Sequence, residues 1–211
     1  MNILFVHQNF PGQFKHLAPA MARQGHRVVA LHINACPPVP GVELVRYPVA
    51  GRPGQGTHRW VADLEVKTLR GEATWQAAMK LREQGFVPDV IVAHPGWGES
   101  LFLQQVWPQA RLGIYCEFFY QHQGADVGFD PEFGNPDTDN ACRLQMKNAN
   151  YELHFARAHA GIAPGNDGDE DAGCGCAYPA WVDDGVVERS NRIIGRLRAT
   201  ARGFPGLTRQ L

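Results

Sequence analysis

The sequence predicts an α/β fold in which helices cover a parallel β-sheet, and three features of the chain lead to this prediction. Short apolar runs of strand length alternate with segments whose apolar residues recur every three or four positions, as on one face of a helix. Glycine or proline stands at most of the boundaries. The order strand, helix, strand also repeats, and such a connection makes consecutive strands parallel.

The first strand–helix–strand unit opens the chain. Asn2–Val6 is a buried apolar strand, residues 13–24 carry one apolar stripe and are expected to form a single helix, and residues 27–33 form a second strand. Gly25 supplies the helix stop. The turn at residues 7–12 therefore follows the first strand at the carboxyl edge of the sheet.

The same alternation continues to about residue 158. The expected elements are a strand at 42–47, a loop at 48–57, a helix at 60–84, a strand at 90–93, a short helix at 98–106, a strand at 111–116 and a helix at 138–158. The apolar positions of the long helix are Trp60, Val61, Leu64, Leu69, Trp75, Met79 and Leu81. Between the last strand and the last helix lies an irregular segment whose aromatic residues are expected to anchor a loop.

The character of the chain changes after about residue 160. Residues 1–160 are predicted to form one Rossmann-like domain, and residues 161–211 an irregular C-terminal tail. The tail is rich in glycine and arginine, and no lysine follows Lys147. We interpret the chain after Pro164 as disordered or out of frame. Resequencing tests the second interpretation, because an uninterrupted reading frame with no coding sequence for a further domain downstream contradicts it.

Composition narrows the function classes. Hydrophobic residues make up 44% and charged residues 19% of the chain, which is ordinary for a folded domain. A formal net charge of −1 offers no basic surface, so no nucleic-acid partner is expected. No apolar run approaches the roughly 18 residues of a membrane span, no secretory signal is recognised, and five scattered cysteines suggest no disulfide framework. We expect a cytoplasmic protein with no integral membrane segment.

The first candidate site is the turn after the first strand, because parallel sheets bind ligands at their carboxyl edge. Gly12 permits a close backbone approach, Pro11 suits the first turn of a helix, and Gln13 begins the expected helix. Exposed N–H groups at a helix start favour an anionic or hydroxyl-rich ligand. Pro11, Gly12 and Gln13 are therefore candidate substrate-binding residues, with a purely structural turn as the equal alternative.

The second candidate site follows the strand at 90–93. His94 is the candidate catalytic residue, because an imidazole titrates near neutral pH and hydrogen-bonds sugar hydroxyls. Gly96 and Trp97 are candidate binding residues, and Trp97 can offer an apolar face to a sugar ring. The alternative is that Trp97 anchors the core and the glycines form a turn. Glu117, at the end of the next strand, is a third candidate at this edge.

No metal site or cofactor is predicted. Four aspartates fit no calcium or magnesium loop and are interpreted as part of a solvated loop: Asp126, Asp130, Asp137 and Asp139. Cys174 and Cys176 lack a second pair of ligands at zinc spacing, so their proximity is interpreted as chance.

Three segments, in this order, resemble the N-terminal domain of family 4 (group 1) glycosyltransferases of the GT-B type. NILFVHQNFPGQFKHLAPAMARQGHRVVAL is similar to the first strand–helix–strand unit of that family, and PDVIVAHPGWGESLFL to its fourth strand and the following turn. LGIYCEFFYQHQGADVGFDPEF is similar to the segment after the next strand in a bacterial subgroup. The resemblance covers residues 1–150.

The resemblance implies one half of a two-domain enzyme. In such enzymes the N-terminal domain mainly binds the acceptor, a glycan or small molecule, and the C-terminal domain binds the nucleotide-sugar donor. Transfer retains the anomeric configuration and uses no metal bound by the Rossmann-like domains. By position, Gly12 would lie near the donor phosphates and His94 near the transferred sugar. The donor domain has no counterpart here, so a separate donor-domain chain is a possible partner.

Two functions remain open, and a third is disfavoured. The chain is either part of a glycosyltransferase, catalytically incomplete alone, or a non-catalytic Rossmann-like module that binds a sugar, nucleotide or protein. An NAD-dependent oxidoreductase is disfavoured, because the first turn has a single glycine and no acidic residue ends the second strand.

Overall fold

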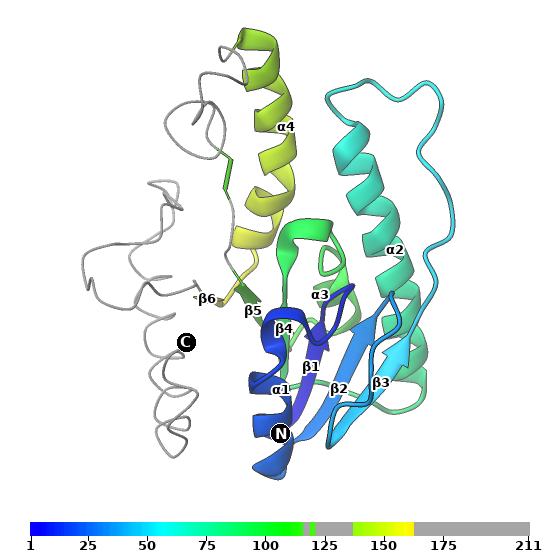
Figure 1. The fold of residues 1–211 in the computed structure, drawn as a ribbon, viewed down its shortest axis with the longest axis vertical. Helices are drawn as coiled ribbons and strands as arrows, with labels where there is room; N and C mark the ends of the chain where they lie inside the picture. Colours follow the sequence, from blue (N-terminus) through cyan, green and yellow to red (C-terminus); the bar gives the residue numbers. More distant parts are fainter. Residues whose placement is uncertain (116–118, 121–136, 163–211) are drawn as a thin grey trace, which may run out of the picture.

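The computed structural model describes residues 1–115, 119–120 and 137–162. They contain a parallel sheet of six strands in the order β3-β2-β1-β4-β5-β6 (Figure 1). The strands are β1 (Asn2–Val6), β2 (Arg27–His32), β3 (Val42–Arg46), β4 (Val90–Ala93), β5 (Arg111–Tyr115) and β6 (Ala160–Ile162). The helices are η1 (Gly12–Phe14), α1 (Leu17–Arg23), α2 (Ala62–Glu83), η2 (Pro95–Trp97), α3 (Leu103–Val106) and α4 (Thr138–Phe155), where η denotes a 3-10 helix. The Rossmann-like fold class is thus confirmed.

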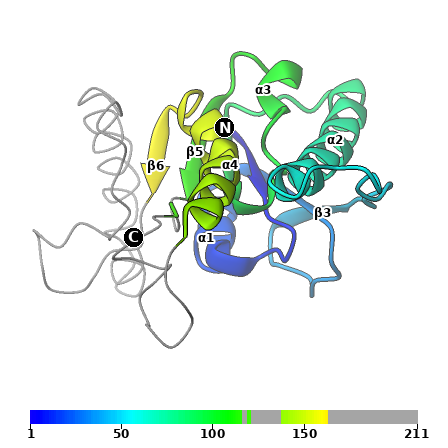
Figure 2. The same cartoon turned by 90° about the horizontal axis from the view of Figure 1, so that it is seen from above.

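Two apolar layers cover the sheet. On one face, β1, β2, β4 and β5 pack against α2 and α3 through a cluster that includes Leu4, Leu31, Ala78, Ile91 and Leu103. On the other face, Phe5 and Ala30 pack against α1 and the preceding turn. Figure 2 shows α1 across the sheet from α3. Upper α2 and α4 stand side by side beyond the carboxyl edge of the sheet (Figure 1).

The helix expected at residues 13–24 is divided into η1 and α1, and the prediction of one helix was wrong. Pro19 explains the division. Proline has no N–H to donate to the carbonyl four residues earlier, and its ring clashes with that carbonyl, so Pro19 is tolerated only in the first helical turn. The α-helix consequently begins at Leu17.

Two further expectations differ from the structure. Only residues 103–106 of the helix expected at 98–106 are α-helical, because Gly98 has a left-handed φ of 88° and the chain turns there. The edge strand β6 was not predicted. It pairs with β5, but its three residues are too few to show an alternating pattern.

The face that α2 presents to the core consists mainly of small side chains. Gly71, Ala73, Thr74, Ala77 and Ala78 are buried. Trp75, one of the apolar positions noted in the sequence, is 37% exposed. Small residues let the helix approach its neighbours closely, and a Cβ added at residue 71 would lie 2.8 Å from the carbonyl oxygen of residue 98.

Gly71→Ala is expected to destabilise the domain although alanine is the better helix former. Alanine gains up to about 1 kcal/mol in helix propensity. Forcing a methyl group against a backbone oxygen costs about 1–3 kcal/mol, and the loss is expected to prevail. Urea unfolding measures the difference. The neighbouring exposed Glu72→Ala is the control, and a Gly71→Ala variant more stable than the wild type would contradict this account of the contact.

Candidate functional site

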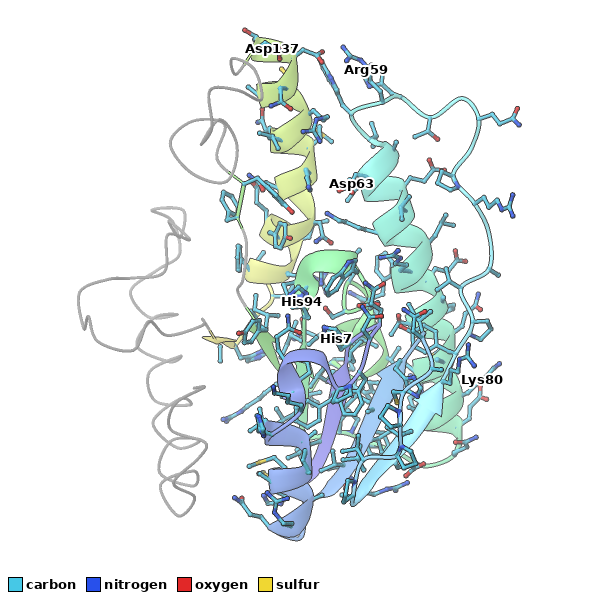
Figure 3. The ribbon with its side chains drawn as sticks, viewed as in Figure 1. His7, Arg59, Asp63, Lys80, His94 and Asp137 are labelled. Carbon is cyan, nitrogen blue, oxygen red and sulfur yellow. The ribbon has the colours of Figure 1, made fainter. Side chains whose placement is uncertain are left out.

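Two histidines stand side by side at the carboxyl edge of the sheet. His7 follows β1 and His94 follows β4, and the two strands pair with Val6 opposite Ala93. Their imidazole centroids are 5.6 Å apart, and the residues are 3% and 2% exposed. Figure 3 labels both at the end of the sheet, beneath the projecting parts of α2 and α4. The structure therefore brings together the two turns that the sequence singled out.

Trp97 completes an aromatic cluster around His94. Its ring centroid is 4.5 Å from that of His94 and 5.2 Å from that of His7. Tyr115, at the end of β5, stacks on His94 at 6.0 Å. Trp97 is only partly buried, so it packs on His94 and also keeps part of its surface exposed. The core-anchor and ligand-facing interpretations of Trp97 are therefore compatible.

Each histidine accepts a backbone hydrogen bond from the turn that follows it. The Nδ1 atom of His7 accepts from the N–H of Asn9 at 3.0 Å, and that of His94 accepts from the N–H of Gly96 at 3.1 Å. A ring nitrogen that accepts carries no proton, so each neutral ring carries its proton on Nε2. The same local geometry thus fixes the donor nitrogen of both rings.

Glycines make these turns possible. Gly12 has a φ of 45°, and a Cβ there would lie 2.6 Å from Cε1 of His7. A Cβ on Gly96 would lie 2.7 Å from Cε1 of His94. Pro11 immediately precedes η1, and Gln13 is exposed within it. Gly12 and Gly96 therefore lie directly against the two imidazoles, and Pro11 and Gln13 are the neighbours of Gly12 in the chain.

The prediction that a long helix begins in the first turn was wrong. Gln13 was expected to begin a long helix whose exposed N–H groups would attract an anion. It instead lies in the three-residue η1, and the α-helix starts at Leu17. Gly12 is therefore not at the N-terminus of an α-helix, and no helix macrodipole contributes to ligand binding there.

Glu99 is a buried acid that the sequence analysis did not identify. It is 0% exposed, and neither carboxyl oxygen has a hydrogen-bond partner among the described residues. Burial raises the pKa of Glu99 to about 8, while the charge of Arg70 lowers it by a smaller amount. At neutral pH, Glu99 is therefore mostly an uncharged carboxylic acid.

Nearby, a side chain of α2 and the residue that follows β3 form a separate hydrogen-bonded pair. The Thr74 hydroxyl donates to the carbonyl oxygen of Arg70 at 2.8 Å, so it accepts from the Tyr47 hydroxyl at 2.7 Å. Burial, and secondarily the charge of Glu99, raises the pKa of Tyr47.

No sequence signal distinguished Glu99 from an exposed glutamate, because its burial results from the packing of a turn against a distant helix.

The other predicted residues have structural roles or lie outside the described residues. Asp137 caps α4 by accepting from the N–H of Asn140 at 2.6 Å, and Asp139 forms an ion pair with Arg59, so these two are not part of a solvated loop. Phe119 packs on Tyr151, as an anchor should. Outside the described ranges lie Glu117, Asp126, Asp130, Cys174, Cys176 and the tail from residue 163 onward.

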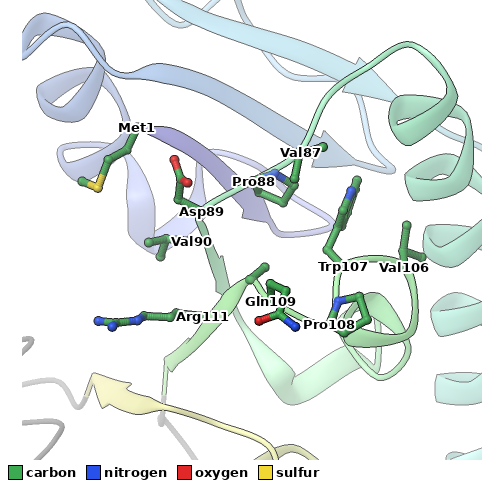
Figure 4. A pocket seen from close by; sticks show the side chains of 11 residues that line it. Met1, Val87, Pro88, Asp89, Val90, Val106, Trp107, Pro108, Gln109 and Arg111 are labelled. Carbon is green, nitrogen blue, oxygen red and sulfur yellow. The ribbon is translucent and has the colours of Figure 1, made fainter.

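Two further observations concern the described residues only. They contain no group of three or more side chains able to hold a metal ion. None of their helices combines the length and apolar character needed to cross a membrane. A surface hollow of about 620 Å³ lies at the amino edge, between the starts of β4 and β5, and is lined by residues that include Val87, Trp107 and Arg111 (Figure 4). It is at the opposite edge from His7 and His94.

Comparison with protein families identifies a match over most of the described chain. The family model described as "Glycosyl transferase family 4 group" matches residues 24–166. This range includes His94, Gly96 and Trp97 but begins after Gly12. A search of curated protein sequences finds no match.

Solved structures with a similar fold include two plant proteins. Os79 from O. sativa, solved with UDP and deoxynivalenol-3-glucoside, has a TM-score of 0.50 at 9% identity and covers 79% of this chain and 47% of its own. A UDP-glucosyltransferase from Polygonum tinctorium gives 0.48 at 12% identity over 79% and 46%. A segment of sucrose-phosphate synthase from Thermosynechococcus elongatus gives 0.49 at 13% identity over 97% and 99%. The chain spans about half the length of the plant enzymes.

The buried carboxyl of Glu99 predicts a specific dependence of stability on pH. Its folded pKa of about 8 lies above its ordinary value of 4.5, so the folded state binds the extra proton between these values. Stability from this group is complete below pH 4.5 and is lost as pH rises through 8. Glu99→Gln is expected to remove this loss and to be more stable than the wild type at pH 8, by an order of a few kcal/mol.

Urea unfolding at pH 5, 6.5 and 8 tests this expectation. The exposed Glu83→Gln on α2 is the matched control. Equal pH slopes for Glu99→Gln and the wild type would show that Glu99 is not the group responsible.

Proposed function

Because the chain belongs to the glycosyl transferase family 4 group, we propose that it takes part in transferring a sugar from a nucleotide-sugar donor to an acceptor. The observation that carries the proposal is the convergence of His7, His94 and Trp97 at the carboxyl edge. This edge lies at the boundary between β1 and β4, where the strand order reverses and where open parallel sheets bind ligands.

The proposed roles follow from the geometry of the two turns. His94, with its donor nitrogen fixed as Nε2, donates a hydrogen bond to the transferred sugar or to the leaving phosphate. Trp97 offers its exposed part to a sugar ring. The turn of Pro11, Gly12 and Gln13 lets the backbone approach the donor phosphates. Gly96 lines the acceptor side of the same edge, and the sequence-based assignment of Glu117 as a binding residue stays a prediction.

A second Rossmann-like domain completes this proposed site. The supporting observation is that the chain covers 47% of Os79 from O. sativa. The second domain would bind the donor nucleotide, either within a longer polypeptide or as a separate chain. Transfer is proposed to retain the anomeric configuration and to need no metal or cofactor, as the resemblance implies. An assay with and without EDTA tests the latter, and the anomeric configuration of the product tests the former.

The alternative function is a non-catalytic module that binds a nucleotide or a sugar. Calorimetry with nucleotide-sugars such as UDP-glucose, followed by a transfer assay with the second domain supplied, separates the two. Binding together with transfer supports the enzyme. Binding without transfer, whichever second domain is supplied, favours the non-catalytic module. Absence of both binding and transfer contradicts the proposed function.

His94→Gln is expected to weaken nucleotide-sugar binding about tenfold or more, because a hydrogen bond to a charged group contributes about 1.5–3 kcal/mol. Calorimetry with UDP-glucose measures the change. His16→Gln, at an exposed histidine between η1 and α1, is the control. Unchanged affinity in a folded His94→Gln protein would exclude contact between His94 and the donor.

Gly12→Ala is expected to abolish measurable binding of UDP-glucose, because its Cβ would displace the His7 ring from 2.6 Å away. Gly25→Ala is a matched control. Gly25 also has a left-handed φ, of 83°, but no atom lies within 4 Å of the added Cβ. Loss of binding in both variants would mean that backbone strain alone accounts for the effect, and wild-type binding by a folded Gly12→Ala protein would contradict a role for the contact with His7.

A further inference from the structure

We propose that Asn150 and His154 of α4 are positioning residues that hold the turn after β4 and thereby fix the orientation of His94. The proposal rests on the role of His94 in the proposed function. Both residues act on His94 through the turn at residues 95–100. Three contacts support this role, one at each end of the turn and one in its middle.

His154 holds the end of the turn at Ser100. Its Nδ1 lies 2.7 Å from the carbonyl oxygen of Asn150, and a carbonyl oxygen only accepts, so Nδ1 carries the proton. The Nε2 atom, 2.8 Å from the Ser100 hydroxyl, must therefore accept from that hydroxyl when the ring is neutral. In the neutral ring, the Ser100 hydroxyl is therefore the donor, Nε2 of His154 is the acceptor, and Nδ1 is the nitrogen that carries the proton.

The surroundings of His154 keep its ring neutral. Burial lowers its pKa to about 4, the hydrogen bond to the Asn150 carbonyl acts in the opposite direction, and the charge of Lys67 lowers the pKa further by a smaller amount. Lys67 is itself buried, with its ammonium 2.7 Å from Asp63 and 5.5 Å from the Tyr151 ring centroid. The tautomer deduced above is consequently maintained throughout the neutral range.

Asn150 holds the beginning of the turn. Its Nδ2 donates to the carbonyl oxygen of Pro95 at 2.8 Å, directly after His94 in the chain. Asn150 is 0% exposed, and its Oδ1 has no hydrogen-bond partner among the described residues. A buried acceptor without a partner destabilises a fold, so stability alone does not explain why an asparagine occupies position 150. Its bond to Pro95 is the interaction that the amide supplies.

α2 supports the middle of the turn. A Cβ on Gly98 would lie 2.5 Å from the backbone oxygen of Lys67, so the two backbones are in direct contact. The turn is thus bonded to α4 at Pro95 and Ser100 and pressed against α2 at Gly98. Within the turn, the N–H of Gly98 donates to the carbonyl oxygen of Pro95 at 3.1 Å. The bond from the N–H of Gly96 to Nδ1 of His94 sets the imidazole plane.

The test measures that internal bond in the full chain, without any ligand. Hydrogen exchange of the Gly96 amide and the ¹⁵N shifts of the His94 ring are recorded by NMR, with His94 assigned from its loss in His94→Gln. His154→Leu removes the acceptor for Ser100, and His154→Gln places an amide oxygen there. Ser100→Ala removes the same bond from the other side. Tyr47→Phe, which removes a buried hydroxyl bond outside the turn, is the control.

In His154→Leu and Ser100→Ala, Gly96 is expected to exchange about fivefold or more faster and the His94 shifts to change, with recovery in His154→Gln. Tyr47→Phe should leave both readouts at wild-type values. Should His154→Leu not fold, Ser100→Ala alone decides. Unchanged Gly96 exchange and His94 shifts in a folded Ser100→Ala protein would overturn the positioning role.

The ligand measurement separates this proposal from the proposed function. If the wild type fails to bind UDP-glucose while Gly96 and His94 respond as expected, positioning stands and the glycosyltransferase role of the site fails. If UDP-glucose binds and Gly96 and His94 do not respond, the proposed function stands and α4 has only a structural role.

Discussion

The candidate site depends on a direct contact between two backbones, that of the turn after β4 and that of α2. A side chain at residue 98 or residue 71 would occupy the space in which the two segments meet, at 2.5 and 2.8 Å from backbone oxygens. Two glycines remove this obstacle. With the turn held this close to the helix, Glu99 and Ser100 are driven into the interior, and His94 is left at the edge of the sheet beside His7. The same contact therefore creates both the buried polar groups and the shape of the site.

Burial then determines the charge state of those groups. Glu99 and His154 are both titratable, and both are neutral near pH 7, because removing either from water penalises its charged form. Their effects on stability have opposite signs. His154, with a pKa lowered to about 4, contributes stability above its ordinary value of 6.5 and loses it as pH falls, whereas Glu99 loses stability as pH rises toward 8. Between about pH 4.5 and 6.5 the two slopes oppose each other.

The sheet and the pairing of the two turns could be predicted because both follow from local patterns. Parallel strands end at one edge, so any residues that follow β1 and β4 must be neighbours, whatever their identity. Gly12, His94 and Trp97 were found in this way. Glu99, Asn150 and His154 were not, because their importance depends on contacts such as that of Ser100 with His154, 54 residues apart. Pro19 was a local signal that the helix begins near Leu17, but the apolar stripe over residues 13–24 favoured a single longer helix.

The turn after β4 is supported by the family match, whereas the turn after β1 is supported by geometry alone. The family match at residues 24–166 contains the turn after β4 and all of α4, so His94, Ser100 and His154 belong to one matched unit. His7 and Gly12 precede it, and their place in the site rests on geometry, chiefly the 5.6 Å between the imidazoles. Arg59, in the segment that precedes α2, forms an exposed ion pair with Asp139 of α4, and such a pair contributes little in water. The contacts through which α4 is proposed to act on His94 are instead the buried bonds of Asn150 to Pro95 and of His154 to Ser100.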